Sequence, residues 1–159
     1  MDTIDSDRRS ENMRRIKSGN TCPEMVVRQL LYRLGYRYRL HWSKLPGKPD
    51  IVLTRARKAI FVHGCFWHQH EFCRHGRLPK SRLDYWAPKL ARNRARDEQI
   101  QRELRALGWD VLVIWECEVA DAERLERCLS RFVGCPRRQN VTRSACPLAT
   151  LEDGLGASS

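Results

Sequence analysis

The 159-residue sequence lacks any long hydrophobic run, and it shows no internal repeat. A membrane-spanning helix needs roughly 18 consecutive apolar residues, and no segment approaches that length, so a membrane protein is not expected. The first ten residues carry acids and arginines in place of an apolar stretch, which excludes a secretory signal there. These absences predict a cytoplasmic protein, and the length suits one domain.

The sequence also lacks the even number of cysteines that is typical of a disulfide-bonded protein. Seven cysteines without a secretory signal argue against a disulfide framework. Cys65 and Cys73 stand apart from the other cysteines because histidines lie between them. Four others are scattered singly and are interpreted as buried or incidental thiols: Cys22, Cys128, Cys135 and Cys146.

Acidic residues are too few to balance the basic ones. Thirty Lys and Arg face nineteen Asp and Glu, which leaves a net charge of +11. Such an excess on a small domain favours a polyanionic partner, because binding to phosphates releases counterions. Charge alone does not exclude a merely soluble basic protein.

The hydrophobic pattern predicts an α/β fold with a mixed central sheet flanked by helices. The expected strands are 36–40, 50–54, 59–62 and 109–115, the second and third forming a hairpin. The expected helices are 21–34, 83–107 or 85–107, and 121–132. We expect residues 1–20 to form an arm with a short amphipathic helix or no helix, 21–133 the folded domain, and 134–159 an irregular tail.

Asp50 opens a hydrophobic strand directly after a Pro-Gly turn. An isolated aspartate in such a place is usually a solvated turn residue. The next strand, however, runs into His63 and a histidine-rich segment. A metal-dependent nuclease needs a carboxylate on Mg²⁺, so Asp50 and the carbonyl end of the 59–62 strand are a candidate Mg²⁺ site.

Residues 63–73 hold two cysteines and three histidines, the densest chemical signal in the chain. Tetrahedral Zn²⁺ takes four Cys or His ligands, and Cys117 at the end of the 109–115 strand is the natural fourth. A redox pair or coincidental buried cysteines are the alternatives. A closed four-ligand site is structural. Spacing alone does not decide whether His68 or His70 is the ligand, and the other histidine is then free to act as a general base.

Aromatic and basic side chains are interspersed along 66–89. Aromatic wedges beside cations unstack bases in DNA-binding proteins, and Phe66 with Trp67 best fits that use. Packing against the sheet is the alternative, with most weight for Tyr85 and Trp109.

Five ordered motifs resemble the very-short-patch repair (Vsr) endonucleases across about residues 7–133. They are NM-x-x-I-K-S-G-N-T-x-P-E at 12–24, KPDIV at 48–52, VHGCFWHQH at 62–70, PKSRLDYW at 79–86 and LGWDVLVIWECE at 107–118, with a further match at 93–97. The resemblance implies a fold related to the PD-(D/E)xK restriction endonucleases. Val62 and His63 stand where that pattern has an acid and a lysine, so the Val62 backbone carbonyl would join Asp50 on Mg²⁺.

The resemblance also assigns roles to further residues. His68 is expected to be the general base, with Glu24, His63 and Asp97 as supporting groups. By local pattern Glu24 is a capping-box residue, and the active-site role is favoured. The expected structural Zn²⁺ ligands are Cys65, His70, Cys73 and Cys117. The expected DNA-contacting residues are Phe66, Trp67 and Trp86 beside the mismatch, Met13 and Ile16 as an N-terminal wedge, and Lys89 and Asn93.

The resulting hypothesis is a bacterial, Mg²⁺-dependent endonuclease that nicks one strand 5′ to the thymine of a T·G mismatch formed by 5-methylcytosine deamination. Its expected partners are double-stranded DNA and, functionally, a cytosine-5 DNA methyltransferase and mismatch-repair proteins. A monomer suits an asymmetric lesion. The rival hypotheses are a restriction-type nuclease that cuts both strands of matched DNA and a zinc-containing DNA-binding module without catalysis.

Overall fold

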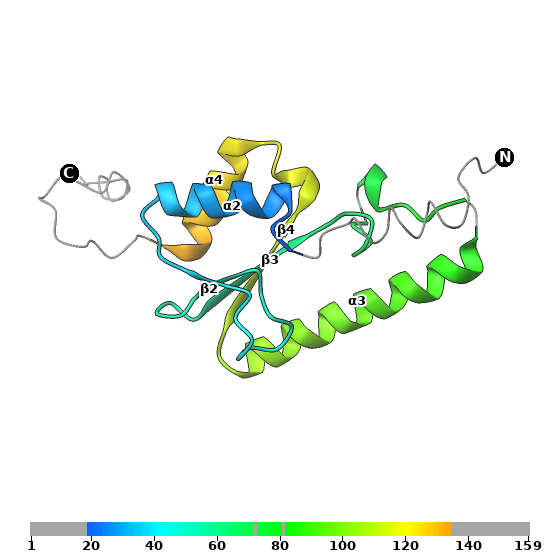
Figure 1. The fold of residues 1–159 in the computed structure, drawn as a ribbon, viewed down its shortest axis with the longest axis horizontal. Helices are drawn as coiled ribbons and strands as arrows, with labels where there is room; N and C mark the ends of the chain where they lie inside the picture. The colour runs from blue at the N-terminus through cyan, green and yellow to red at the C-terminus, as the bar shows by residue number, and fades with distance from the viewer. Residues whose placement is uncertain (1–18, 72, 81, 135–159) are drawn as a thin grey trace, which may run out of the picture.

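A computed structural model describes residues 19–71, 73–80 and 82–134 (Figure 1). The elements are α2 (Cys22–Arg33), β1 (Arg39–Leu40), β2 (Ile51–Leu53), β3 (Lys58–His63), the 3-10 turn η1 (Arg74–Gly76), α3 (Leu83–Ala106), β4 (Asp110–Trp115), the 3-10 turn η2 (Glu116–Glu118) and α4 (Ala122–Val133). Most of the predicted arm, including Met13 and Ile16, and the predicted tail beyond Gly134 lie outside the described residues. Within the described part of the chain, no helix is both long and apolar enough to cross a membrane.

The four strands form one mixed sheet in the order β1-β2-β3-β4. β1 to β3 are antiparallel neighbours, whereas β4 pairs parallel with β3. The predicted mixed sheet and the β2–β3 hairpin are thereby confirmed. The prediction of a strand over 36–40 was wrong in extent. Only Arg39 and Leu40 pair with β2, while Tyr36 packs into the core under α2 and α4.

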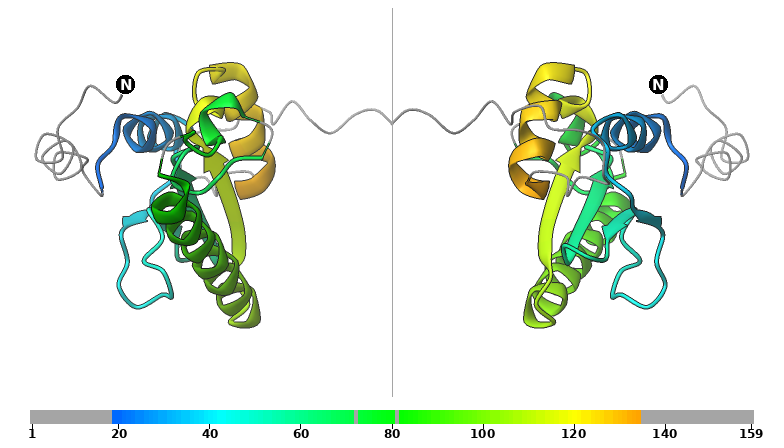
Figure 2. Two further views of the ribbon diagram at one scale, coloured as in Figure 1. Left: turned by 90° about the vertical axis from the view of Figure 1, so that its right-hand side faces the viewer. Right: turned by 90° about the vertical axis from the view of Figure 1, so that its left-hand side faces the viewer.

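Helices cover both faces of the sheet: α2 and α4 lie on one side and α3 lies on the other (Figures 1 and 2). Alternation along the strands explains these layers, because successive side chains point to opposite faces. Ile60 packs with Leu31 of α2 and Leu129 of α4 in one core, and Phe61 packs with Leu104 of α3 in the other. A sheet buried on both faces needs apolar residues at consecutive positions, and β2 has three in a row.

Helix ends follow the sequence signals only in part. Asp121 caps α4, as is common for aspartate at a helix N-terminus. Its Oδ1 accepts a hydrogen bond from the Arg124 backbone N–H at 3.0 Å. Thr21 precedes α2 but makes no side-chain cap bond. Its hydroxyl instead donates to Glu24. Thr21 thus occupies the N-cap position without a side-chain cap bond, because its hydroxyl is bonded to the Glu24 carboxylate.

The Pro-Gly turn between β1 and β2 packs directly on α3. Gly47 has a φ of +71°, and a Cβ there would lie 2.4 Å from Cγ2 of Ile100. Only glycine combines that backbone conformation with so close an approach. The turn thus holds the segment leading into Asp50 against α3.

Candidate active site

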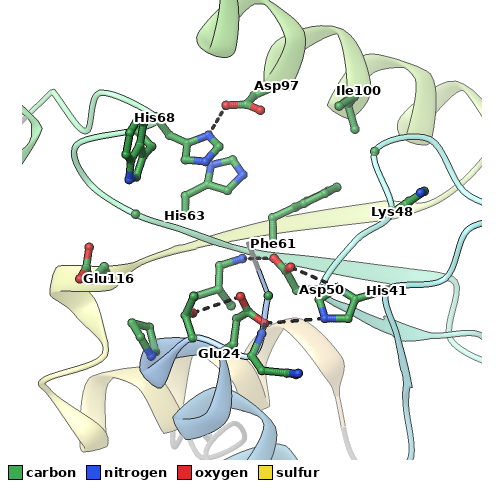
Figure 3. A pocket seen from close by; sticks show the side chains of 18 of the residues that line it. Glu24, His41, Lys48, Asp50, Phe61, His63, His68, Asp97, Ile100 and Glu116 are labelled. Carbon is green, nitrogen blue, oxygen red and sulfur yellow. Dashed lines mark hydrogen bonds and ion pairs between the residues drawn. The ribbon is translucent and has the colours of Figure 1, made fainter. Parts of the chain in front are cut away.

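A cavity of about 1050 Å³ opens between the N-terminal end of α2, the loop from β1 to β2, the end of β3 and the middle of α3. Figure 3 shows its polar side chains, which reach the cavity from segments far apart in the sequence. All five predicted catalytic residues line it: Glu24, Asp50, His63, His68 and Asp97.

Asp50 lies directly before β2 and is held by the neighbouring strand. Its Oδ2 accepts from the backbone N–H of Val62 at 2.8 Å, so the carboxylate and the end of β3 lie together as predicted. Burial raises the pKa of Asp50, and the nearby Glu24 carboxylate adds to that effect, while the Val62 N–H opposes it. A carboxylate kept in a partly buried cavity despite this cost is typical of a functional site.

Glu24 sits on the first turn of α2 with both oxygens engaged. Oε2 accepts from the Asn20 backbone N–H at 2.9 Å and from Arg28 Nη2 at 2.7 Å, and Oε1 accepts from Thr21 at 3.1 Å. The residue is 3% exposed, and Arg28 is 5% exposed. Glu24 therefore lies at the cavity wall, but it accepts from the Asn20 N–H and not from that of the N-cap residue Thr21, so the capping-box interpretation was wrong.

His68 forms a pair with Asp97 of α3, whose carboxylate bonds to His68 Nδ1. A carboxylate at Nδ1 fixes the proton there in the neutral ring and leaves Nε2 as an acceptor. The His63 ring stacks on His68 with centroids 3.8 Å apart. Burial, and next the neighbouring His68, lower the pKa of His63 to about 4. His63 is therefore a neutral support for a histidine that is set up to accept a proton.

His41 lines the same cavity and was missed by the sequence analysis. Its ring nitrogens lie 3.9 Å from Glu24 Oε2 and 3.7 Å from Asp50 Oδ1. The reason is strand register. Leu40 pairs with Ile51, so the next residue, His41, faces Asp50, and its backbone N–H donates to the Asp50 carbonyl. Pairing the first two predicted strands around the Pro-Gly turn is the one signal that would have found it.

The four predicted Zn²⁺ ligands meet in one cluster outside the cavity. The ligand atoms of Cys65, His70, Cys73 and Cys117 all lie within 4.8 Å of one another. His70 Nδ1 is 3.8 Å from Cys65 Sγ and 3.3 Å from Cys117 Sγ. Zn–S and Zn–N bonds at tetrahedral angles place sulfur and nitrogen about 3.6 Å apart. The donor set and its spacing therefore fit a tetrahedral zinc ion.

Parallel pairing of β3 with β4 explains why these distant residues meet. His63 is the register partner of Trp115, so Cys65 and Cys117 each lie two residues beyond the paired ends. The His70 ring stacks on Trp115 at 4.3 Å. Within the cluster the thiols differ, because the His75 backbone N–H lowers the pKa of Cys73 whereas burial raises that of Cys65.

Phe66, Trp67 and Trp86 form an aromatic cluster next to the cavity. Their ring centroids lie 5.2 to 6.0 Å apart. Phe66 and Trp67 are partly exposed, whereas Trp86 is 8% exposed and is buried like a core residue. The ammonium of Lys89 lies 5.6 Å from the ring centroids of both tryptophans. Aromatic rings beside a cation thus gather here from the loop and from α3.

One face of α3 holds the loop that carries these side chains. Lys89, Asn93 and Asp97 follow one another at a spacing of four, which places them on the same side of a helix. Asn93 donates to the Trp67 carbonyl at 3.3 Å, and Asp97 bonds to His68. Asn93 and Asp97 therefore hold the loop within the protein, and the DNA contacts of Lys89 and Asn93 stay predictions.

Comparisons with known proteins agree on one family. A family model described as DNA mismatch endonuclease Vsr matches residues 1–74. The type II nicking enzyme V.XorIIP of Xanthomonas oryzae pv. oryzae is 54% identical over 132 residues, which cover 83% of this chain and 96% of that protein. The DNA mismatch endonuclease Vsr of Escherichia coli is 40% identical over 124 residues, which cover 78% of this chain and 79% of that protein.

A third relative, the type II nicking enzyme V.NmeAIP of Neisseria meningitidis, is 40% identical over 132 residues, which cover 83% of this chain and 94% of that protein. These relatives confirm the family predicted from the ordered motifs, and they make the chain a DNA-cleaving hydrolase. The chain belongs to the Vsr family of DNA mismatch endonucleases.

Proposed function

We propose that this endonuclease depends on Mg²⁺ and nicks one DNA strand on the 5′ side of the thymine in a T·G mismatch produced by 5-methylcytosine deamination. The main support is the combination of a partly buried carboxylate, Asp50, and a carboxylate-oriented histidine, His68, in one cavity of a DNA-cleaving enzyme. The relatives' names describe mismatch endonuclease and nicking activities, which favours a single-strand cut.

Asp50 and the backbone carbonyl of Val62 are the proposed Mg²⁺ ligands. Hard oxygen donors suit this cation, and Asp50 has an oxygen, Oδ1, that accepts no hydrogen bond among the described contacts. Glu24 is hydrogen-bonded to Asn20, Thr21 and Arg28, and it is proposed to support the site without binding the metal directly. When bound, the cation supplies stabilisation of the negative charge on the phosphate and the leaving oxygen.

His68 is the proposed general base. Nε2 accepts a proton from the attacking water as the water oxygen bonds to phosphorus in line with the leaving oxygen. Asp97 stabilises the positive charge that His68 then carries. The buried His63 ring beside His68 stays neutral, because its pKa is lowered to about 4. A second positive ring with its centroid 3.8 Å away would oppose proton transfer to His68. These three residues therefore act as one proton-accepting unit.

Recognition of the mismatch is assigned to the aromatic cluster and the N-terminal arm. The aromatic side chains of Phe66, Trp67 and Trp86 are proposed to enter the base stack beside the lesion from one groove of the DNA. Met13 and Ile16 are proposed to enter as a wedge from the opposite groove. A mismatched step costs less to unstack than a matched one.

Such lesions link the enzyme functionally to a cytosine-5 DNA methyltransferase and to mismatch-repair proteins. A monomer suits the asymmetric substrate. We further propose that the sheet belongs to the PD-(D/E)xK class.

Strand and mismatch specificity are tested with purified protein, Mg²⁺ and labelled duplexes that differ only in T·G or T·A at one position. We expect nicking of the thymine strand at least about 100-fold faster in the mismatch, since unstacking differences of a few kcal/mol separate the two substrates. Denaturing gels read out each strand. Equal cutting of both strands in matched DNA would instead establish the restriction-type rival, and binding without any cutting would establish the catalytically inactive module.

The cysteine cluster is proposed to hold one structural Zn²⁺. In the protein as purified we expect about one zinc per chain, and Cys117→Ser should lower both the zinc content and the melting temperature because the tetrahedral set loses a ligand. Elemental analysis and thermal unfolding measure the two effects. Cys128→Ser is the matched control, since Cys128 is exposed on α4 and outside the cluster. Zinc content unchanged by Cys117→Ser would refute the ligand assignment.

A further inference from the structure

Arg28 and His41 lie beside Asp50, and the proposed chemistry assigns neither of them a role. The Arg28 guanidinium is almost fully buried. Its Nη2 lies 2.7 Å from Glu24 Oε2 and 3.0 Å from His41 Nε2, and its Nη1 lies 2.6 Å from Asn20 Oδ1. In Figure 3 dashed lines join the ring of His41 to Glu24 and to Asp50.

The contact with Arg28 decides which nitrogen of His41 carries the proton. A guanidinium has N–H donors and no acceptor, so His41 Nε2 accepts the bond from Arg28. The proton of the neutral ring is then on Nδ1, which lies 3.7 Å from Asp50 Oδ1. A small rotation of the ring brings this N–H within hydrogen-bond distance of the carboxylate.

We propose that Arg28 and His41 position Asp50: Arg28 fixes the His41 ring with its Nδ1–H directed at Asp50 Oδ1, while the Val62 N–H holds Oδ2 from the other strand. This inference rests on the proposed role of Asp50 as the cation ligand. His41 acts through Asp50 and is a positioning residue. We call the arrangement of Arg28, His41 and Asp50 the relay. Hydrogen-bond partners of a ligating carboxylate orient it, and their loss weakens metal binding.

A direct metal-binding role for His41 is the competing explanation, because donor atoms of Glu24, His41 and Asp50 all lie within 4.8 Å of one another. The neighbours of these atoms argue against it. The lone pair of Nε2 is used by Arg28, Nδ1 carries a proton, and the guanidinium 3.0 Å away repels a divalent cation.

The ring state is tested directly by NMR of the histidine ring nitrogens in the full chain at neutral pH, without DNA or divalent cation. We expect His41 as the Nδ1–H tautomer, with its assignment made by comparison with His41→Gln. Observation of the Nε2–H tautomer would overturn the relay, because Arg28 then has no acceptor on the ring. This measurement does not depend on nuclease activity.

Cation binding tests the consequence. Mn²⁺ titrated into the protein without DNA and followed by EPR should bind His41→Ala about tenfold more weakly than the parent. His41→Gln should stay within about threefold, because glutamine offers an acceptor oxygen for Arg28 and a donor nitrogen for Asp50. The His41 side chain is 38% exposed, so both variants should melt near the parent, and His75→Ala is the exposed histidine control.

Each outcome separates the relay from the function on which it rests. If Asp50→Asn binds Mn²⁺ like the parent, the role of Asp50 fails and the relay fails with it. If Asp50→Asn loses binding while His41→Ala keeps parental affinity, only the relay fails. A ¹⁴N coupling to bound Mn²⁺ that disappears in His41→Gln would make His41 a direct ligand and would also overturn the proposal.

Discussion

Replacing Asp50 by asparagine is expected to lower the nicking rate by about 1000-fold or more at saturating DNA. The substitution keeps the shape of the side chain and removes the charge that holds the cation. Electrostatic stabilisation of several kcal/mol is thereby lost, and about 4 kcal/mol corresponds to a factor of about 1000. Single-turnover gels on the T·G duplex measure the rate. A decrease of less than tenfold would remove Asp50 from the centre of the reaction.

The same variant should not be less stable than the parent, and this separates lost chemistry from misfolding. Burial raises the pKa of Asp50 in the folded protein. A carboxyl with a raised pKa favours the folded state below its unfolded pKa, and this contribution is lost as pH rises through the folded value. At pH 7 without divalent cation, which is above the unfolded pKa, the Asp50 carboxyl therefore disfavours folding. The asparagine side chain of the variant carries no charge, so the melting temperature should equal or exceed that of the parent, and the difference should shrink in acid.

Asp110→Asn is the matched control for both measurements. Asp110 begins β4, is 69% exposed and pairs with Lys58 at 3.4 Å. Surface pairs of this kind contribute about 0–1 kcal/mol, so rate and stability should stay near parental values. A similar loss of activity in Asp110→Asn would mean that the assay reports general damage to the sheet.

Replacing His68 by alanine is expected to lower kcat by about 100- to 10,000-fold, the usual contribution of a general base. His63 does not substitute for it, because its pKa of about 4 makes it a very weak base and it is 7% exposed. Quench-flow or single-turnover nicking measures the change. DNA affinity, measured by fluorescence anisotropy in Ca²⁺, should change by less than about threefold if His68 acts on the proton alone.

Two further variants test this assignment. Asp97→Asn should fall between the parent and His68→Ala, because the amide no longer stabilises the protonated ring. His75→Ala, a change to an exposed histidine on the same loop, should leave the rate unchanged. Retention of more than about a tenth of the parental rate in His68→Ala would show that another group accepts the proton.

Several features of this protein were predictable from local patterns in the sequence. Alternating and helical periodicities located the β2–β3 hairpin and the three described α-helices, because each pattern depends on which face of a local element is buried. Cysteines and histidines at short spacing indicated a metal cluster. The ordered Vsr motifs identified the family and singled out Asp50, His68 and Asp97, which share one cavity.

Tertiary structure alone decided the contacts that depend on register. The parallel pairing of β3 with β4 brings Cys117 to the Cys65 loop, and the antiparallel pairing of β1 with β2 brings His41 opposite Asp50. A shift of one residue in either pair would turn these side chains to the other face of the sheet. Local spacing contains no information on such pairings. The sequence thus determined the family and predicted the metal ligands of one loop. The network of Arg28, His41 and Asp50 emerged only from the packed strands, because it joins residues that no local pattern relates.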